Sequence, residues 1–349
     1  MPRIKKIRVA IVAPPFGTTG GPEIVVQNLT NTLLERKDVS VTLFAPADWH
    51  TKARHIATLK KSLWNMRDFA KQTLRERKNY IVASQLPVLL YQNDFDVIHL
   101  HLQNFSAALG TNMKTPCVLS LHNPINKRDL SQIKKVGIHV VAITKAQKGS
   151  LEIPTIIWNG VPIRKIFPSY KKGSYLIAIG RLTDQKGIHR AIAIAKKAQK
   201  KLIVVGRIGN EENRQIYYKK MIKPFIDGKG IVHIEHLSRK DLFASLKKAS
   251  ALLFPIIRIE PFGLVVAEAL ACGTPVIGSR VSPLPEILKN KKTAFLSNDL
   301  KELVSAVKNI NRFDRRECRR YAEENFDSAV MAEKYVKVYK SVLNKSSHF

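Results

Sequence analysis

The chain has 349 residues, of which 45% are hydrophobic and 25% charged, so it is long enough for two folded domains and is not compositionally disordered. Its three cysteines lack metal-ligand or disulfide spacing, and no apolar run reaches the roughly 18 residues of a membrane span. These features exclude a zinc module, a disulfide framework and a membrane-spanning protein. We therefore expect a cytoplasmic protein, with the inner face of the membrane as an alternative location.

The net charge of +32 has two interpretations. Such a field attracts polyanions, whether nucleic acid, anionic lipid or phosphorylated glycan. Alternatively, the charges are spread over a solvated surface and reflect compositional bias alone. We expect no specific nucleic-acid partner.

The first residues have the pattern of a βαβ unit. Residues 7–14 read as a buried strand, 23–36 as a helix and 39–46 as a second strand. This order predicts an α/β fold with a doubly wound parallel sheet, in which ligands bind at the carboxyl ends of the strands.

A glycine-rich turn precedes the first helix. It is not the G-x-G-x-x-G of dinucleotide folds, and no acidic residue ends the second strand, so NAD binding is not expected. Gly20 and Gly21 stand at the helix entrance, where they either let the backbone approach a ligand or only turn the chain.

Residues 51–80 are predicted to form a basic amphipathic helix, because apolar residues recur at helical spacing from Ile56 to Leu74. Such a helix can lie on an anionic membrane or hold a phosphorylated acceptor, or its charges form only a solvated face. The basic residues are Lys52, Arg54, Lys60, Lys61, Arg67, Lys71, Arg75, Arg77 and Lys78.

Two features follow at the next strands. Asp94-Phe95-Asp96 matches a D-x-D metal motif, but we interpret it as a polar turn before a buried strand over 97–101, whose His99 and His101 share one face. His122 ends a strand over 117–121, where ligands are expected, and is a candidate hydrogen-bond donor or proton relay.

Proline, glycine and lysine between 159 and 172 mark the best domain boundary, which we place between 165 and 166. A second βα series follows, so residues 1–165 and 166–325 form separate domains. Predicted strands are 175–180, 202–206, 232–234, 252–255 and 276–279, predicted helices are 188–199, 242–249, 264–271 and 301–310, and 321–343 is largely helical.

The stretch 260–277 reads as an acidic residue, a turn, a helix and a strand. The unpaired amides at the helix mouth, including those of Phe262, Gly263 and Leu264, form an anion site. Two carboxylates flank it: Glu260 lies just outside the helix mouth, and Glu268 lies about six residues into the helix, roughly 9 Å along its axis. This spacing suits a sugar nucleotide, with the sugar near Glu260 and the ribose near Glu268, but also an ordinary αβ unit with a surface glutamate.

Arg181 and Lys186 leave the end of one strand close to where Glu260 leaves another. Two cations beside a helix mouth can neutralise a diphosphate and the charge that develops as it departs.

These residues together resemble glycosyltransferase family 4, of the GT-B class with two Rossmann-like domains. The matching blocks are Gly20-Gly21, Asn159-Gly160-Val161, Gly180-Arg181-Leu182 with Lys186-Gly187, Glu260-Pro261-Phe262-Gly263-Leu264 with Glu268-Ala269, Ala271-Cys272-Gly273-Thr274-Pro275-Val276-Ile277 and Pro285-Glu286. The likeness covers nearly the whole chain, and its E-x7-E block is specific.

The resemblance implies transfer from a nucleotide sugar, in the first place a UDP-sugar, with retention of configuration and without a metal or other cofactor. It implies that Arg181 and Lys186 hold the diphosphate and Glu268 the ribose. Glu260 and the three amides hold the sugar and distal phosphate, while Gly20 and Gly21 close over the diphosphate from the other domain. His122 lies beside the sugar, the amino-terminal domain binds the acceptor, and a final helix over about 326–349 crosses back onto that domain.

Two positions depart from the family pattern. Pro255 lies five residues before Glu260 and is followed by Ile256 in place of serine, so the sugar-pocket loop is longer. Pro162 stands where aspartate commonly follows Asn-Gly-Val. The acceptor is left undetermined among lipid-linked glycan, lipopolysaccharide core, small metabolite and protein. A non-catalytic polyanion-binding protein and a nucleotide-sugar epimerase remain as alternatives.

Overall fold

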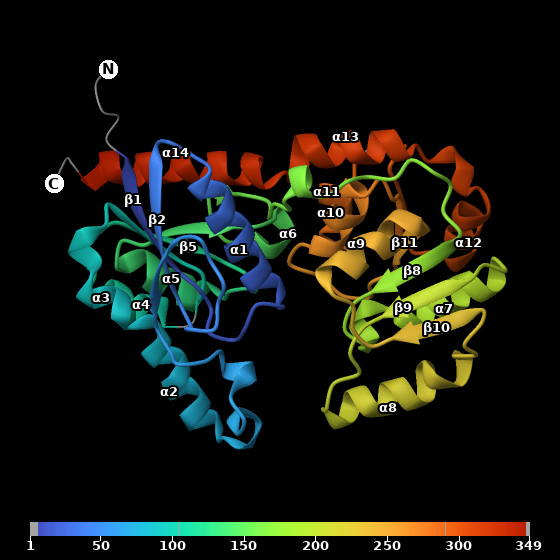
Figure 1. Cartoon of the computed structure of the whole chain (residues 1–349), viewed down its shortest axis with the longest axis horizontal. Helices are drawn as coiled ribbons and strands as arrows, with labels where there is room; N and C mark the ends of the chain where they lie inside the picture. The colour runs from blue at the N-terminus through green and yellow to red at the C-terminus, as the bar shows by residue number, and fades with distance from the viewer. Residues whose placement is uncertain (1–5, 104, 290, 347–349) are drawn as a thin grey trace. The chain divides into compact units, whose positions relative to one another are not determined.

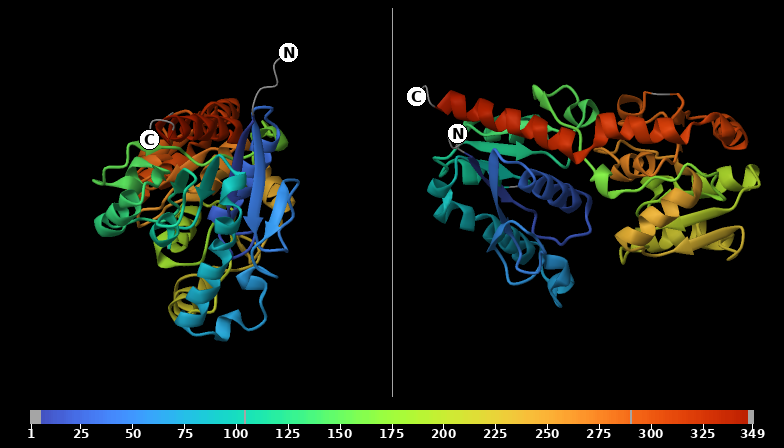
Figure 2. Two further views of the ribbon diagram at one scale, coloured as in Figure 1. Left: turned by 90° about the vertical axis from the view of Figure 1, so that its left-hand side faces the viewer. Right: turned by 45° about the horizontal axis from the view of Figure 1, so that its top comes forward.

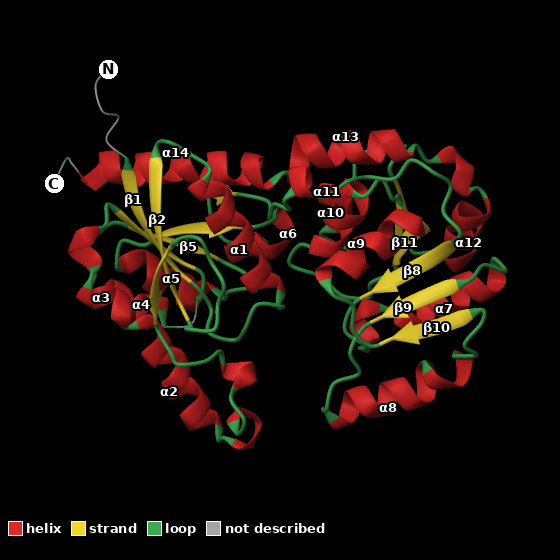
Figure 3. Ribbon diagram, in the orientation of Figure 1, coloured by secondary structure: helices red, strands yellow, loops and turns green. Residues whose placement is uncertain are grey.

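The computed structural model describes residues 6–103, 105–289 and 291–346. The chain forms two compact units (Figure 1). One contains the residues up to Pro162 together with those from Ser328 onward, and the other is Ile163–Asp327. Each unit is built on one parallel sheet flanked by helices (Figure 3).

The first unit has a seven-stranded sheet in the order β3-β2-β1-β4-β5-β6-β7, with every neighbouring pair parallel. The order reverses direction between β1 and β4, which is where open α/β sheets bind ligands at their carboxyl edge. The strands are β1 Ile7–Val12, β2 Val39–Ala45, β3 Arg54–Ala57, β4 Val97–Leu100, β5 Cys117–Ser120, β6 His139–Ala142 and β7 Thr155–Ile156. The α-helices are α1 Gly21–Leu34, α2 Leu74–Gln85, α3 Pro87–Leu90, α4 Ser106–Gly110, α5 Lys127–Lys135, α6 Lys145–Lys148 and α14 Ser328–Ser346, with short 3-10 helices at Leu63–Asn65, Phe69–Lys71 and Gln92–Asp94.

The second unit has a six-stranded parallel sheet in the order β10-β9-β8-β11-β12-β13, and its order reverses between β8 and β11. The strands are β8 Tyr175–Ile179, β9 Leu202–Val205, β10 Ile231–Ile234, β11 Ala249–Phe254, β12 Val276–Gly278 and β13 Ala294–Leu296. The α-helices are α7 Ile188–Lys197, α8 Glu212–Met221, α9 Arg239–Lys248, α10 Leu264–Ala271, α11 Leu284–Ile287, α12 Leu300–Lys308 and α13 Arg315–Phe326, with 3-10 turns at Ile163–Lys165, Asp184–Lys186, Lys223–Phe225 and Ile310–Arg312.

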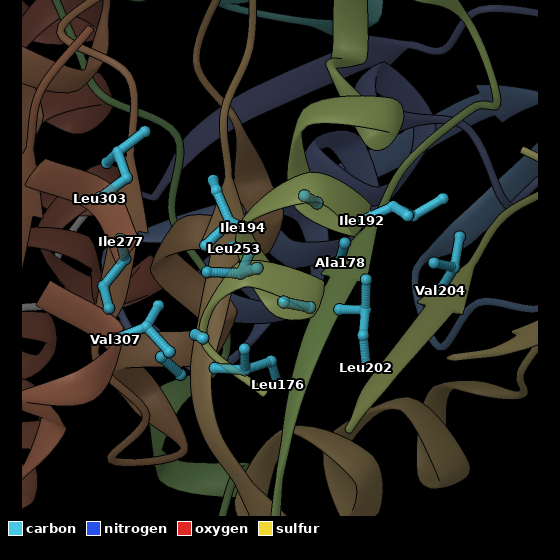
Figure 4. Close-up of a cluster of buried hydrophobic side chains, with 14 of the residues drawn as sticks. Leu176, Ala178, Ile192, Ile194, Leu202, Val204, Leu253, Ile277, Leu303 and Val307 are labelled. Carbon is cyan, nitrogen blue, oxygen red and sulfur yellow. The ribbon is translucent and has the colours of Figure 1, made fainter. Parts of the chain in front are cut away.

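The core of the second unit shows why these apolar runs form strands. Leu176 and Ala178 of β8 share one buried cluster with Ile192 of α7 and Val307 of α12 (Figure 4). All four side chains are buried. Fully burying an aliphatic side chain contributes roughly 1.5–3 kcal/mol, so the sheet and its helices hold each other in place.

The predicted helix over residues 51–80 is wrong. Residues 54–57 are instead strand β3, which pairs in parallel with Thr42–Ala45 of β2, and α2 begins only at Leu74. Pairing with the sheet edge satisfies backbone groups that a helix would have satisfied internally. The apolar spacing was misleading, since Leu63 is buried but Leu74 is 75% exposed.

The carboxyl-terminal helical region is two helices, because α13 ends at Phe326 and α14 starts at Ser328. The amide of Ser328 donates to Val161 O, and α14 then runs alongside α1 in the first unit (Figure 2). Among the described residues, no helix is both long and apolar enough to cross a membrane.

Candidate functional site

The mouth of α10 lies at the carboxyl edge of the second sheet. Strand β11 ends at Phe254, a loop follows, and Gly263 caps α10 with φ +88°, a left-handed conformation that favours glycine. Phe262 is buried with its ring against Phe326, and this contact holds the loop in place. The first amides of a helix, here from Leu264 on, have no intrahelical acceptor and attract anions.

Gly187 brings the loop after β8 against the loop after β11. Its φ is +66°, and a Cβ atom there would lie 2.0 Å from Pro255 O, so no other residue fits this approach. The amide of Ile257 donates to Gln185 O at 2.9 Å, and the Ser279 hydroxyl donates to Ile256 O. The longer loop that the sequence shows after Pro255 is therefore fixed at both of its first two residues.

Lys186 and Glu260 meet across these two loops in a hydrogen-bonded ion pair. Their side chains are 15% and 18% exposed, so the pair is largely shielded from water yet reachable. Lys186 Nζ also lies 5.9 Å from the centre of the Phe254 ring. An ammonium group has three donors, so Lys186 can bond Glu260 and still donate to a phosphate oxygen.

Glu268 points from α10 to α9. It is buried, and its Oε1 lies 2.7 Å from Nη2 of Arg239, which also stacks over Phe243. The geometry of this contact is off the direction of a hydrogen bond, so Oε1 has an ion-pair partner but no hydrogen-bond donor among the described residues. A carboxylate held in this way retains the capacity to accept hydroxyl donors such as those of a ribose.

Arg181 lies two residues after the end of β8 and is exposed. In the described part of the chain it forms no ion pair with Glu260 or Glu268. The pKa of Glu211 is lowered, chiefly by the hydrogen bond from its own amide and, to a smaller extent, by the charges of Arg214 and Arg181. The structure therefore brings Lys186 and Glu260 together, whereas Arg181 lies at the exposed edge of the candidate donor site.

The first unit has its own polar cavity, of about 80 Å³, at the carboxyl edge of β4 and β5. Glu23, His101 and His122 line it, together with Gln103. Gly20 caps α1, and a Cβ atom there would meet the Glu23 carboxylate at 2.1 Å, whereas Gly21 is the exposed first residue of that helix. This volume accommodates a hydroxyl or hydroxymethyl group, given that a water molecule occupies about 30 Å³ in the liquid.

The cavity contains unsatisfied polar atoms. Among the described residues, Nε2 of buried His101 and Oε1 of Gln103 have no hydrogen-bond partner. Glu23 is 2% exposed, and burial raises the pKa of its carboxyl to about 7. Buried polar groups normally find partners, so this cavity is suited to a ligand that supplies them.

Histidines extend the network below the cavity. His101 Nδ1 and His122 Nε2 lie 3.0 Å apart, and the rings of His99 and His101 are in contact, with centroids 4.1 Å apart. His99 bonds Tyr339 and Ser120, and Ser120 bonds Tyr335. Burial lowers the pKa of His122 to about 4 and that of His99 to about 3, so these rings are neutral at pH 7.

The D-x-D motif forms the predicted polar turn before a buried strand, because the 3-10 helix Gln92–Asp94 ends just before β4. Asp96 accepts hydrogen bonds from the backbone and side chain of Arg8, which lies at the start of the neighbouring strand β1. Sequence reasoning missed Glu23, Gln103 and Arg239. A glutamate in the first turn of a helix is ordinary, and Arg239 lies far from the E-x7-E block in sequence, so only the position of Gln103 near a strand end was a usable indication.

Family comparison is decisive for the class of protein. Residues 19–161 match the model described as Glycosyltransferase Family 4, and residues 162–325 match Glycosyl transferases group 1. The chain belongs to glycosyltransferase family 4. The resemblance that the motifs predicted is confirmed over both halves of this glycosyltransferase.

The chain is also similar to proteins of known sequence and, in its fold, to a solved structure. The glycosyltransferase is 24% identical to an uncharacterised 41.2 kDa protein in the cps region of Klebsiella pneumoniae, covering 92% of this chain and 97% of that one. It is 28% identical to the O-antigen chain mannosyltransferase of Salmonella typhimurium, covering 49% and 50%. Anabaena HepE, solved in complex with UDP-glucose, has a similar fold with a TM-score of 0.72 at 17% identity, covering 96% and 100%.

Proposed function

We propose that this glycosyltransferase transfers a sugar from a nucleotide sugar, in the first place a UDP-sugar, to a hydroxyl group of a glycan, a lipid-linked glycan or a small molecule. The observation that carries the proposal is the Lys186–Glu260 pair beside the mouth of α10. It combines a cation, a carboxylate and free amides at the carboxyl edge of the sheet, which are the groups that a sugar diphosphate needs.

In this proposal the donor's diphosphate lies at the amides of Phe262, Gly263 and Leu264, close to Lys186 and Arg181. Charge on the leaving diphosphate is neutralised by these groups as the bond to the sugar loosens, so no metal ion is required. Glu260 accepts hydroxyl groups of the sugar, and Glu268, held by Arg239, accepts those of the ribose. The acceptor attacks from the face that the diphosphate leaves, which retains the anomeric configuration.

The polar cavity of Glu23, His101 and His122 is the acceptor side of the proposal. His122 is neutral and its Nε2 is paired with His101 Nδ1, so its Nδ1 is the ring nitrogen that can form a hydrogen bond with a sugar hydroxyl. The similarity to an O-antigen chain mannosyltransferase and to a protein of a cps region supports a role in polysaccharide biosynthesis.

Calorimetry with UDP tests the donor site. We expect UDP to bind the wild-type protein and to bind Arg181→Ala and Lys186→Ala at least tenfold more weakly. Lys197→Ala is the matched control, because Lys197 is an exposed lysine at the end of α7 in the same unit. Wild-type affinity in both site variants would contradict the assignment. Salt-dependent binding of RNA or vesicles without sugar transfer would favour the polyanion-binding alternative, and an altered donor without acceptor product would favour an epimerase.

A peripheral contact with anionic membrane through residues 51–80 is a separate part of the proposal. This segment exposes Trp64 and Leu74 beside its lysines and arginines, although it is a strand, two short turns and the start of α2. Apolar and basic side chains together favour the surface of an anionic bilayer. Flotation with vesicles containing anionic lipid should retain the wild-type protein, and Lys60→Glu with Lys61→Glu should reduce that retention; equal binding to neutral vesicles would contradict the contact.

A further inference from the structure

A cavity of about 660 Å³ lies at the amino edge of the second sheet. Gly173 and Ser250 line it at the starts of β8 and β11, and Lys292 lines it just before β13. All strands of this sheet are parallel, so these residues lie at the edge opposite to Lys186 and Glu260. The length of β11, at about 3.3 Å per residue, puts roughly 17 Å between the two edges.

The lining of this amino-edge cavity is strongly basic. Among the described residues that line it, five are lysine or arginine, namely Lys172, Lys292, Arg312, Arg315 and Arg316, and one is acidic, Asp314. The ratio in the whole chain is 59 to 27, so the cavity is more basic than the general bias of the sequence explains. The Asp314 carboxylate already accepts from the amides of Arg316 and Glu317, where it caps α13.

Two of the arginines are positioned by aromatic rings. The guanidinium of Arg316 lies 4.6 Å from the ring centre of Tyr170, and that of Arg312 lies 4.6 Å from the ring centre of Phe295. In the part of the chain that the structure describes, neither arginine forms an ion pair with a carboxylate. Stacking occupies the face of a guanidinium and leaves its N–H edge for anionic oxygens, so these donors are oriented before a ligand arrives.

The floor of the cavity is rigid. Arg315 donates to the carbonyl oxygens of Ser169, Ala249 and Lys247, and to the Thr274 hydroxyl. This arginine ties the starts of β11 and β12 to α13, and its donors are used in doing so. Because the donors of Arg315 are used in this way, the ligand site is argued from Lys172, Arg312 and Arg316.

We propose that the amino-edge cavity is a second ligand site, which binds a small molecule carrying two or more phosphate groups. Its volume lies within the range of about 300–1,000 Å³ that is usual for small-molecule sites. Several cations around one cavity match a charge of at least two, and stacked arginines bind phosphate oxygens in pairs. The proposal does not depend on the proposed sugar transfer, because it uses none of the donor-site residues.

The test is calorimetric titration with inorganic tripolyphosphate while the donor site is saturated with UDP. We expect the wild-type protein to bind one tripolyphosphate, and the double variant Lys172→Gln, Arg316→Gln to bind it at least tenfold more weakly. The control is Lys219→Gln, Lys220→Gln, which removes the same charge from exposed positions of α8 in the same unit and should bind as the wild type does.

Thermal unfolding of each variant checks that it is folded, and Arg312→Lys supplies a second variant that keeps the charge but loses the planar donor edge. Weaker binding by Arg312→Lys supports the oriented-arginine geometry. The proposal is overturned by no binding to the wild-type protein, by displacement of UDP in place of independent binding, or by equal losses in the site and control variants. Binding of long RNA without binding of tripolyphosphate would also overturn it.

Discussion

Three glutamates, two in the second unit and one in the first, have opposite surroundings. In the second unit, Glu260 faces Lys186 and Glu268 faces Arg239. In the first unit, the described residues that line the cavity of Glu23 include no lysine or arginine, and burial raises the pKa of its carboxyl to about 7. A nearby cation favours a carboxylate in its charged form, whereas burial alone favours the protonated form. The two glutamates of the second unit thus each have a cationic partner, whereas Glu23 exchanges a proton near neutral pH.

The largest effect is expected from breaking the Lys186–Glu260 pair. Lys186→Ala removes a cation from the leaving diphosphate and leaves Glu260 without its partner, so sugar transfer should fall about 10²- to 10³-fold, as it does when a preorganised donor is lost. Initial rates with a UDP-sugar, beside those of Lys197→Ala, provide the measurement. A change of less than threefold would mean that Lys186 has no role in the reaction.

Glu23→Gln tests the difference between the carboxylates through the free energy of unfolding. The folded protein holds a proton on Glu23 up to a pKa of about 7, above the ordinary value of 4.5, so this contribution is complete below pH 4.5 and is lost as the pH rises through 7. Glutamine does not ionise, so the variant does not lose this contribution to stability as the pH rises. The variant should match the wild type at pH 4.5 and exceed it by about 1–3 kcal/mol at pH 8.

Urea unfolding at the two pH values gives the difference directly. The histidines with lowered pKa destabilise the fold as the pH falls below 6.5, but they do so equally in both proteins and cancel. Glu152→Gln, at an exposed position of the same unit, is the control. A Glu23→Gln variant with the pH profile of the wild type would show that Glu23 ionises normally.

Arg239→Met tests the other carboxylate. Methionine keeps the packing on Phe243 but removes the charge beside Glu268, so the carboxylate loses its orientation toward a ribose. We expect UDP affinity to fall about tenfold, or about 1.4 kcal/mol. Lys240→Met, at the next and exposed position, should leave the affinity unchanged. Equal affinities for both variants would exclude a positioning role of Arg239.

The smallest effect concerns the tyrosines of α14. Tyr335→Phe should cost about 1 kcal/mol, because Ser120 loses one partner but still bonds His99. Tyr339→Phe leaves His99 Nδ1 without its partner and should cost more. Chemical denaturation ranks the two, and the reverse order would contradict the network.

The sequence was sufficient for the features that depend on strand order. Unbroken apolar runs identified most strands, and Lys186 meets Glu260 because each follows one of two adjacent parallel strands. The prediction of a helix over residues 51–80 was wrong because helical spacing of apolar residues does not show whether the segment pairs with the edge of a sheet. Glu23 and Arg239 could not be identified from the sequence, because their roles depend on burial and on contacts between helices. Neither leaves a local sequence pattern.

The tyrosines of α14 also affect the order in which the two units can fold and the way in which the chain can be cut for chimeras. The first unit needs Tyr335 and Tyr339 to complete the hydrogen bonds of His99 and Ser120, yet both tyrosines follow the whole second unit in the chain. During synthesis, the whole second unit is therefore made before the first unit can finish folding. Chimeras that exchange the first unit with a relative should carry residues 1–162 and 328–349 as one set, since a single junction leaves these buried hydroxyl and imidazole groups facing a foreign helix.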